Sequence, residues 1–230
     1  MKKKRISLQL VSICVCIIFV LSGCQQQTAF QKILKSAESI CFIGDSVTAG
    51  SNNEGHPWFE PLIDLTDAEI TNYSWGGATT YTLLEKISEI TQTQAEYYVI
   101  AIGTNDIRFR NEENSAMTAE EYIANLDSLV EAVVEINDDA EFVFITPWYS
   151  IESDPVSVLS YGKKIEMNQE YSEALSNWCI ENNYLLIDPQ PYIMEKIESG
   201  ESNYYLLDYI HPNKEQGIRM YAEAVFEYKE

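Results

Sequence analysis

Ser46 is the first candidate for chemistry, because it stands in a glycine-flanked loop directly after an apolar run. The surrounding residues read "FIGDSVTAG" (42–50). Loops rich in Gly, Asp and Ser are commonly structural turns, and a serine hydroxyl reacts only when a base takes its proton. A phosphate-binding loop would need Gly-Lys-Ser/Thr and an α/β-hydrolase elbow would need G-x-S-x-G, and this loop matches neither. Whether Ser46 is a nucleophile therefore depends on its base.

The choice of base is narrow, since the sequence contains two histidines, His56 and His211. His211 follows Asp208 by three residues in "LLDYIHPNKEQG", and this spacing lets the carboxylate accept the imidazole N–H. The alternative for this segment is an aspartate that caps a turn beside a surface histidine. His56 lies in "NNEGHPW" with only Glu54 nearby, which favours a position at the rim of a pocket. We expect His211 as the base and Asp208 as its acid.

Two other aspartates are alternatives for the acid. Asp188 stands at the end of the apolar run "YLLID", but nothing in its spacing links it to a histidine. Asp45 is adjacent to Ser46, so its side chain should turn away from the nucleophile and bind the backbone of its own turn. Asp208 therefore remains the expected partner of the histidine.

Acyl transfer also requires hydrogen-bond donors for the oxyanion. Three candidates follow three different apolar runs: the backbone N–H of Ser46, the backbone N–H of Gly77 in "WGGATT" and the side-chain amide of Asn105 in "GTNDIR". Each has a structural alternative, since paired glycines form turns and an Asn-Asp pair caps helices. Together they predict an oxyanion hole built from three loops.

The elements that must position these residues are strands alternating with helices. The predicted strands cover residues 39–44, 68–74, 97–103, 141–147 and 184–188, and the helical segments cover 79–92, 119–137, 162–183 and 213–229. Continuous apolar strands separated by helices indicate a parallel sheet covered on both faces. We therefore predict one α/β domain, a three-layer α/β/α sandwich with a central five-stranded parallel sheet. Ligands bind beyond the carboxyl ends of such strands, where the candidate loops lie.

At these positions the sequence resembles the SGNH hydrolases, also called GDSL-type esterases. The blocks of that family match "GDSVT" (44–48), "NYSWGGATT" (72–80), "GTND" (103–106) and "DYIHP" (208–212). The resemblance implies a flavodoxin-like SGNH fold and a serine esterase that needs no metal or organic cofactor. It makes Ser46 the nucleophile, His211 the general base and Asp208 its orienting acid.

The resemblance also implies which groups form the oxyanion hole: Ser46, Gly77 and Asn105. One departure from the family's pattern affects the choice of the glycine. Ser74 stands where many members have glycine, and the two glycines that follow are adjacent, so Gly76 is an alternative to Gly77. Gly77 is favoured because its distance of five residues from Asn72 matches the spacing in the family.

The first 24 residues resemble a bacterial lipoprotein signal. A basic "MKKKR" precedes the apolar run "ISLQLVSICVCIIFVL", and "LSGC" follows directly. By this resemblance residues 1–23 are removed and Cys24 carries the lipid, which predicts an extracytoplasmic domain anchored in the cell membrane. The alternative is an uncleaved signal anchor, since the run is nearly long enough to span a bilayer. We expect residues 24–38 to form a tether, which could become helical, and residues 39–230 to form the hydrolase domain.

Charge and cysteine content limit the partners. The 230-residue sequence has 15 Lys and Arg against 36 Asp and Glu, a net charge of −21, and loss of the four basic residues in the leader would make it −25. Such a surface repels nucleic acid and other polyanions and favours neutral or cationic substrates. Cys41 and Cys179 lie in apolar or helical stretches and are expected as buried thiols. We expect a monomer that meets the membrane only through its lipid, and no metal, because no Cys or His cluster has ligand spacing.

The expected reaction is hydrolysis of a short-chain ester, an acetyl ester, on an extracellular carbohydrate. Four aromatic residues near the strand ends could stack on a sugar or simply pack the loops: Trp58, Trp75, Trp148 and Tyr149. One alternative is a lipid-directed esterase of the lysophospholipase or thioesterase type. Another is a surface lipoprotein that binds glycan without catalysis.

Overall fold

A parallel sheet forms the centre of the molecule. The computed structural model describes residues 26–108, 117–152, 159–200 and 202–229. In this part of the chain the strands lie in the order β2-β1-β3-β4-β5, and each neighbouring pair is parallel. Their bounds are β1 Ser39–Gly44, β2 Glu69–Ser74, β3 Tyr97–Ala101, β4 Glu141–Ile145 and β5 Leu185–Ile187. The five predicted strands are confirmed, and their ends lie close to those expected.

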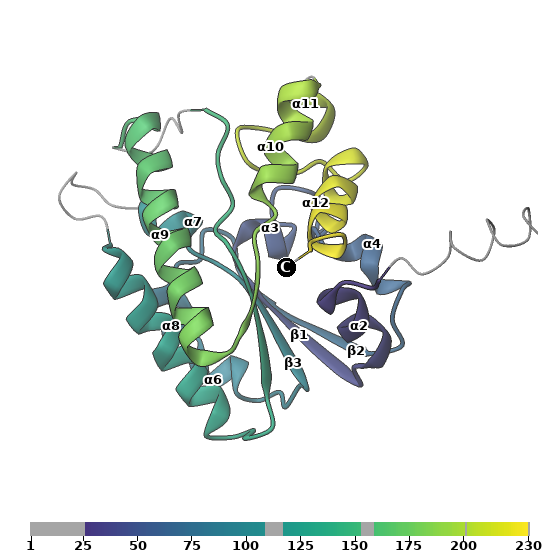
Figure 1. The fold of residues 1–230 in the computed structure, drawn as a ribbon, viewed down its shortest axis with the longest axis vertical. Coiled ribbons are helices and arrows are strands. Elements are labelled where there is room, and N and C mark those ends of the chain that lie inside the picture. Colours follow the sequence, from purple (N-terminus) through teal and green to yellow (C-terminus); the bar gives the residue numbers. More distant parts are fainter. Residues whose placement is uncertain (1–25, 109–116, 153–158, 201, 230) are drawn as a thin grey trace, which may run out of the picture.

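Helices cover both faces of the sheet (Figure 1). One layer consists of α2 (Ala29–Ser36), α4 (Glu60–Ile63), α10 (Gln190–Ser199) and α12 (Gln216–Phe226). The other consists of α5 (Thr80–Glu85), α6 (Ile87–Ile90), α8 (Ala119–Val134) and α9 (Tyr161–Asn182). Three short helices complete the described elements: α3 (Ser46–Ala49), α7 (Thr104–Arg108) and α11 (Ser202–Tyr205). The expected three-layer α/β/α sandwich is confirmed.

Each face of the sheet has its own apolar core, because successive side chains of a strand point to opposite faces. In β1, Ile40 and Phe42 pack on the side of α2 and α12, whereas Cys41 and Ile43 pack on the side of α8 and α9. Cys179 of α9 belongs to this second core. Both thiols are free and buried, and burial raises the pKa of Cys41 to about 11 and that of Cys179 to about 12.

The strand order places two of the candidate loops at a topological switch point. β2 and β3 lie on opposite sides of β1, and the chain leaves β1 and β3 towards opposite helical layers. In open α/β sheets such a point leaves a crevice at the carboxyl ends of the strands, where ligands bind. Ser46 follows β1 and Asn105 follows β3, so both residues stand at this edge of the sheet.

The folded domain begins earlier than the sequence predicted. Residues 28–37, expected as part of a tether that could become helical, form α2 with its caps and pack on the domain. The N-cap residue Thr28 donates its hydroxyl to the carbonyl of Phe226 at 2.9 Å, which ties α2 to the end of α12. The apolar face of the helix is buried in the first core through Phe30, Ile33 and Leu34. An amphipathic helix of this kind lowers its free energy by covering the sheet, so the predicted boundary at residue 39 is wrong.

The predicted signal residues 1–23 and the predicted lipidation site Cys24 lie outside the described residues. Among the helices that the structure does describe, none is long and apolar enough to cross a membrane. The lipoprotein anchor stays a prediction from the sequence.

A buried carboxyl group of α7, the short helix after β3, contacts the start of α5. Asp106 is 1% exposed and accepts hydrogen bonds from the Thr80 N–H at 3.0 Å and from the Thr80 hydroxyl. Burial raises the pKa of Asp106 to about 7, although the hydrogen bonds from Thr80 act in the opposite direction. The link holds Asn105 beside the loop of Gly77, because Asn105 precedes Asp106 and Thr80 follows Gly77 closely in sequence.

Replacing Asp106 with Asn should change how stability depends on pH. The ordinary pKa of an aspartate, which applies to the unfolded chain, is 3.8, and that of Asp106 in the folded protein is about 7. Unfolding therefore releases a proton between these values, and this group makes the wild type less stable as the pH rises. The free energy of unfolding of Asp106→Asn minus that of the wild type should increase from pH 4 to pH 7, by at most about 1.4 kcal/mol per pH unit. Urea unfolding across this range measures the difference, and a constant or falling difference would contradict the assignment.

Candidate active site

Ser46 is held at the tip of a tight turn between β1 and α3. Asp45 caps α3, because its Oδ1 accepts the Val47 N–H at 3.0 Å. This is the local role that the sequence predicted for Asp45. Gly44 has no room for a side chain, since an added Cβ would lie 2.5 Å from the Ala101 carbonyl oxygen of β3. Close packing of β1 on β3 and the cap together keep Ser46 at the carboxyl edge of the sheet.

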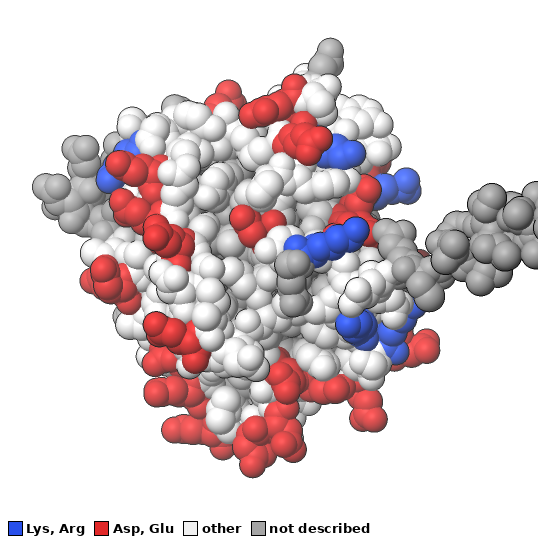
Figure 2. All heavy atoms as spheres, in the orientation of Figure 1, with Lys and Arg blue, Asp and Glu red and all other residues white. Residues whose placement is uncertain are grey.

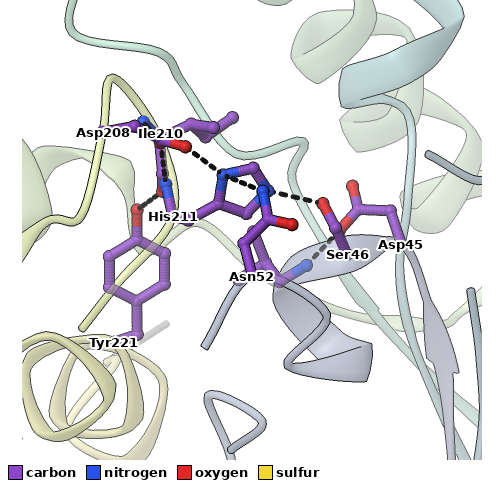
Figure 3. A network of polar contacts seen from close by, with 8 residues as sticks. Asp45, Ser46, Asn52, Asp208, Ile210, His211 and Tyr221 are labelled. Atoms are coloured by element: carbon purple, nitrogen blue, oxygen red, sulfur yellow. Dashed lines mark hydrogen bonds and ion pairs between the residues drawn. The ribbon is translucent and has the colours of Figure 1, made fainter. Parts of the chain in front are cut away.

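The three predicted catalytic residues form a chain of hydrogen bonds (Figure 3). Ser46 Oγ lies 2.8 Å from His211 Nε2, and His211 Nδ1 lies 2.7 Å from Asp208 Oδ2. With its proton on Nδ1, the imidazole donates to the carboxylate and accepts from the serine hydroxyl through Nε2. In this arrangement the imidazole can take the serine proton as the hydroxyl attacks a carbonyl carbon.

The loop between α11 and α12 presents His211 in a defined position. Asp208 Oδ1 accepts the backbone N–H groups of Ile210 at 2.9 Å and of His211 at 2.8 Å. The carboxylate therefore holds the backbone of the histidine as well as its ring. From α12, the Tyr221 hydroxyl donates to the Ile210 carbonyl at 3.0 Å and fixes the loop from the other side.

Asp208 keeps its negative charge at this position. Partial burial acts to raise its pKa, but hydrogen bonds from His211 and Ile210 outweigh that effect and lower the pKa of Asp208 to about 2. The side chain of His211 is 4% exposed, whereas that of Asp208 is 34% exposed. An imidazole that gains a proton here meets a carboxylate that is already ionised, which stabilises the positive charge formed during proton transfer.

The three expected oxyanion donors come from loops that adjoin one another. Ser46 is the first residue of α3, a position whose N–H has no partner within the helix. Gly77 has a φ of 73°, in the left-handed region that favours glycine, whereas Gly76 is not in that region. Asn105 is 2% exposed, and its Nδ2 donates to the Ala78 carbonyl at 2.9 Å, which uses one of its two N–H bonds. The backbone conformation therefore favours glycine at position 77, and the role of Gly77 as a donor stays a prediction.

The other acids and the other histidine make local contacts. His56 Nδ1 pairs with Glu60 Oε2 at 2.6 Å, and 37% of the His56 side chain is exposed. The sequence had pointed to Glu54 as the nearby acid, but Glu54 pairs with Lys214. Asp188 accepts the Thr146 hydroxyl at 2.8 Å at the end of the sheet. Among the described residues, no group of three His, Cys, Asp or Glu side chains is placed to hold a metal ion.

Two of the four aromatic residues expected near a substrate rim are core residues. Trp58 is 0% and Trp148 is 1% exposed, and their rings lie 5.9 Å apart in the first core. Trp58 also donates its Nε1 proton to the Thr48 hydroxyl of α3 at 3.2 Å. This hydrogen bond supports the turn that carries Ser46. The expectation of a sugar platform is therefore wrong for these two, whereas Trp75 and Tyr149 are half-buried.

One side chain at the site was not predicted from the sequence. Asn52 Nδ2 lies 3.1 Å from Nδ1 and 3.3 Å from Nε2 of His211. Asn52 belongs to the polar stretch "GSNNEG", and nothing in that stretch distinguishes it from the neighbouring Asn53. Only the fold, which brings this loop to His211, identifies it.

Comparison with known proteins identifies a family for this chain. A family model described as "GDSL-like Lipase/Acylhydrolase family" matches residues 42–216, which include the four sequence blocks. No curated protein has a sequence that matches the chain significantly.

Solved structures share the fold at low sequence identity. A GDSL-like lipase from Parabacteroides merdae has a TM-score of 0.66 at 21% identity, covering 84% of this chain and 97% of its own. A member of the lipolytic G-D-S-L family from Veillonella parvula has a TM-score of 0.65 at 21% identity, covering 82% and 96%. The acetylxylan esterase Axe2 from Geobacillus stearothermophilus has a TM-score of 0.59 at 21% identity, covering 83% and 93%. Because the family match extends over most of its length, this chain belongs to the GDSL-like lipase/acylhydrolase family and is a carboxylic ester hydrolase.

Proposed function

We propose that the protein is a serine esterase that works through an acyl-enzyme on Ser46. The observation that carries the proposal is the 2.8 Å contact between Ser46 Oγ and His211 Nε2, with Asp208 on the other ring nitrogen. His211 takes the hydroxyl proton as Ser46 Oγ attacks the ester carbonyl carbon. The resulting oxyanion accepts hydrogen bonds from the N–H groups of Ser46, Gly77 and Asn105.

The same imidazole serves both halves of the reaction. When the bond from the carbonyl carbon to the alcohol oxygen breaks, His211 returns its proton to that oxygen and the alcohol leaves. A water molecule then gives a proton to His211 and attacks the acyl carbon, and Ser46 Oγ leaves and regains its proton. Asp208 carries the balancing negative charge each time the imidazole is protonated.

We propose that the substrate is a carbohydrate outside the cytoplasm that carries a short acyl group, acetyl, in ester linkage. The similar structure of Axe2 is that of an acetylxylan esterase, and three Axe2 structures are of catalytic mutants with a serine, an aspartate or a histidine replaced by alanine. That aspartate and histidine are three positions apart, as Asp208 and His211 are. The location rests on the predicted lipidation of Cys24.

The charge of the surface supports a neutral substrate over a polyanion. Figure 2 shows acidic side chains spread over much of the face in view. The whole chain carries 36 Asp and Glu against 15 Lys and Arg. Such a surface repels polyanions, whereas a neutral O-acetylated glycan carries no charge for it to repel.

A series of nitrophenyl esters tests the reaction and the acyl group together. We expect kcat/KM to be higher for the acetyl ester than for the octanoyl ester, and acetylated glycans to be deacetylated. Ser46→Ala should lose turnover and fluorophosphonate labelling while keeping the melting temperature of the wild type, because it removes only the attacking oxygen. Faster cleavage of the octanoyl ester would favour a lipid esterase. A folded wild type that neither reacts nor is labelled would favour a glycan-binding protein.

Asn105→Ala tests the oxyanion hole. The substitution removes a side-chain donor, so kcat for the acetyl ester should fall roughly 10²- to 10³-fold. Circular dichroism and thermal melting establish that the variant is folded, which matters because Asn105 also holds the Ala78 carbonyl. A folded variant whose kcat changes by less than a few-fold would remove Asn105 from the oxyanion hole.

A further inference from the structure

A side chain from another loop covers one face of the candidate catalytic imidazole. Asn52 Nδ2 lies within 3.3 Å of both ring nitrogens of His211. Since Cε1 lies between those nitrogens in the ring plane, an atom so close to both cannot lie in that plane without overlapping Cε1. The amide nitrogen therefore lies over the face of the ring, and Figure 3 shows the Asn52 side chain in front of it.

The contact adds to the hydrogen bonds of the ring and does not compete with them. In the ring plane, Nε2 already meets Ser46 Oγ at 2.8 Å and Nδ1 meets Asp208 Oδ2 at 2.7 Å. Two contacts in the ring plane oppose rotation within that plane more than tilting out of it. A third contact from outside the plane opposes this tilt, because the ring would have to push the amide aside. An N–H over an aromatic face is also weakly favourable.

The loop that carries Asn52 is itself held beside the histidine loop. Gly50 ends α3 in the left-handed conformation with a φ of 67° and turns the chain towards Asn52. Two residues beyond Asn52, Glu54 pairs with Lys214 at 2.6 Å, and Lys214 follows His211 by three positions. Both side chains of this pair are exposed, so it contributes little energy but shows that the two loops lie together.

We propose that Asn52 is a positioning residue for His211: its carboxamide covers the imidazole face and keeps Nε2 directed at Ser46 Oγ. The inference deepens the proposed esterase reaction and rests on it for its effect on rate. It predicts that removing the side chain loosens the ring before any substrate binds and then slows each step in which His211 takes a proton, from Ser46 or from water.

The looseness of the ring is measurable without a substrate. Because the sequence contains only His56 and His211, protein labelled with ¹⁵N-histidine gives signals from two imidazoles. The Nδ1–H of His211, which donates to Asp208, should give a sharp low-field proton signal in the wild type. In Asn52→Ala this signal should broaden or vanish. Asn52→Leu, which keeps the branched shape of the side chain without the amide, should restore it. A signal that is equally sharp in Asn52→Ala, or equally lost in Asn52→Leu, would overturn the proposal.

Kinetics separate this role from direct contact with substrate. In Asn52→Ala, kcat for nitrophenyl acetate and the rate of fluorophosphonate labelling should both fall roughly 10-fold, because both need the serine proton removed, while KM stays within about two-fold. Ser51→Ala, an exposed neighbour in the same loop, should behave as the wild type. An unchanged kcat, or a rise in KM alone, would overturn the proposal. A wild type without turnover or labelling would instead refute the esterase function, which the ring signal does not test.

Discussion

The hydrogen bond between Ser46 Oγ and His211 Nε2 is the contact on which the candidate site depends. It joins two loops whose residues lie 165 positions apart in the sequence. Each partner is fixed by its own contacts: the cap from Asp45 orients the serine turn, and Asp208 holds both the ring and the backbone of the histidine. Both partners of the proposed proton transfer are therefore held in place by the fold, which is the condition for efficient preorganised catalysis.

The order of the strands explains why the candidate oxyanion donors lie beside Ser46. The loops after β2, β1 and β3 adjoin at one edge, and side-chain amides join them across the edge. Asn72 of β2 donates to the Thr48 carbonyl of α3 at 3.0 Å, and Asn105 after β3 donates to the Ala78 carbonyl at 2.9 Å. The same contacts that stabilise the edge therefore set the relative positions of Ser46 and the candidate oxyanion donors.

The sequence was sufficient to predict the sheet, because its apolar strands are continuous. It was also sufficient to predict that Asp208 lies beside His211, because the two residues are three positions apart. It was insufficient wherever the direction of a side chain depends on packing. Trp58 and Trp148 lie in segments after strand ends, where residues at the rim of a site are expected, yet both side chains are buried in the core. Asn52 meets His211 through a contact between loops 159 positions apart, which local sequence does not encode. The packing of α2 on α12 escaped prediction for the same reason.

Trapping the acyl-enzyme tests the central claim most directly. The protein is mixed with nitrophenyl acetate, quenched with acid during turnover, digested and examined by mass spectrometry. The account predicts one acetyl group on the peptide that contains Ser46, located on the Ser46 side chain, and none in Ser46→Ala. Turnover that persists in Ser46→Ala, or an acetyl group formed during turnover on a different residue, would contradict it.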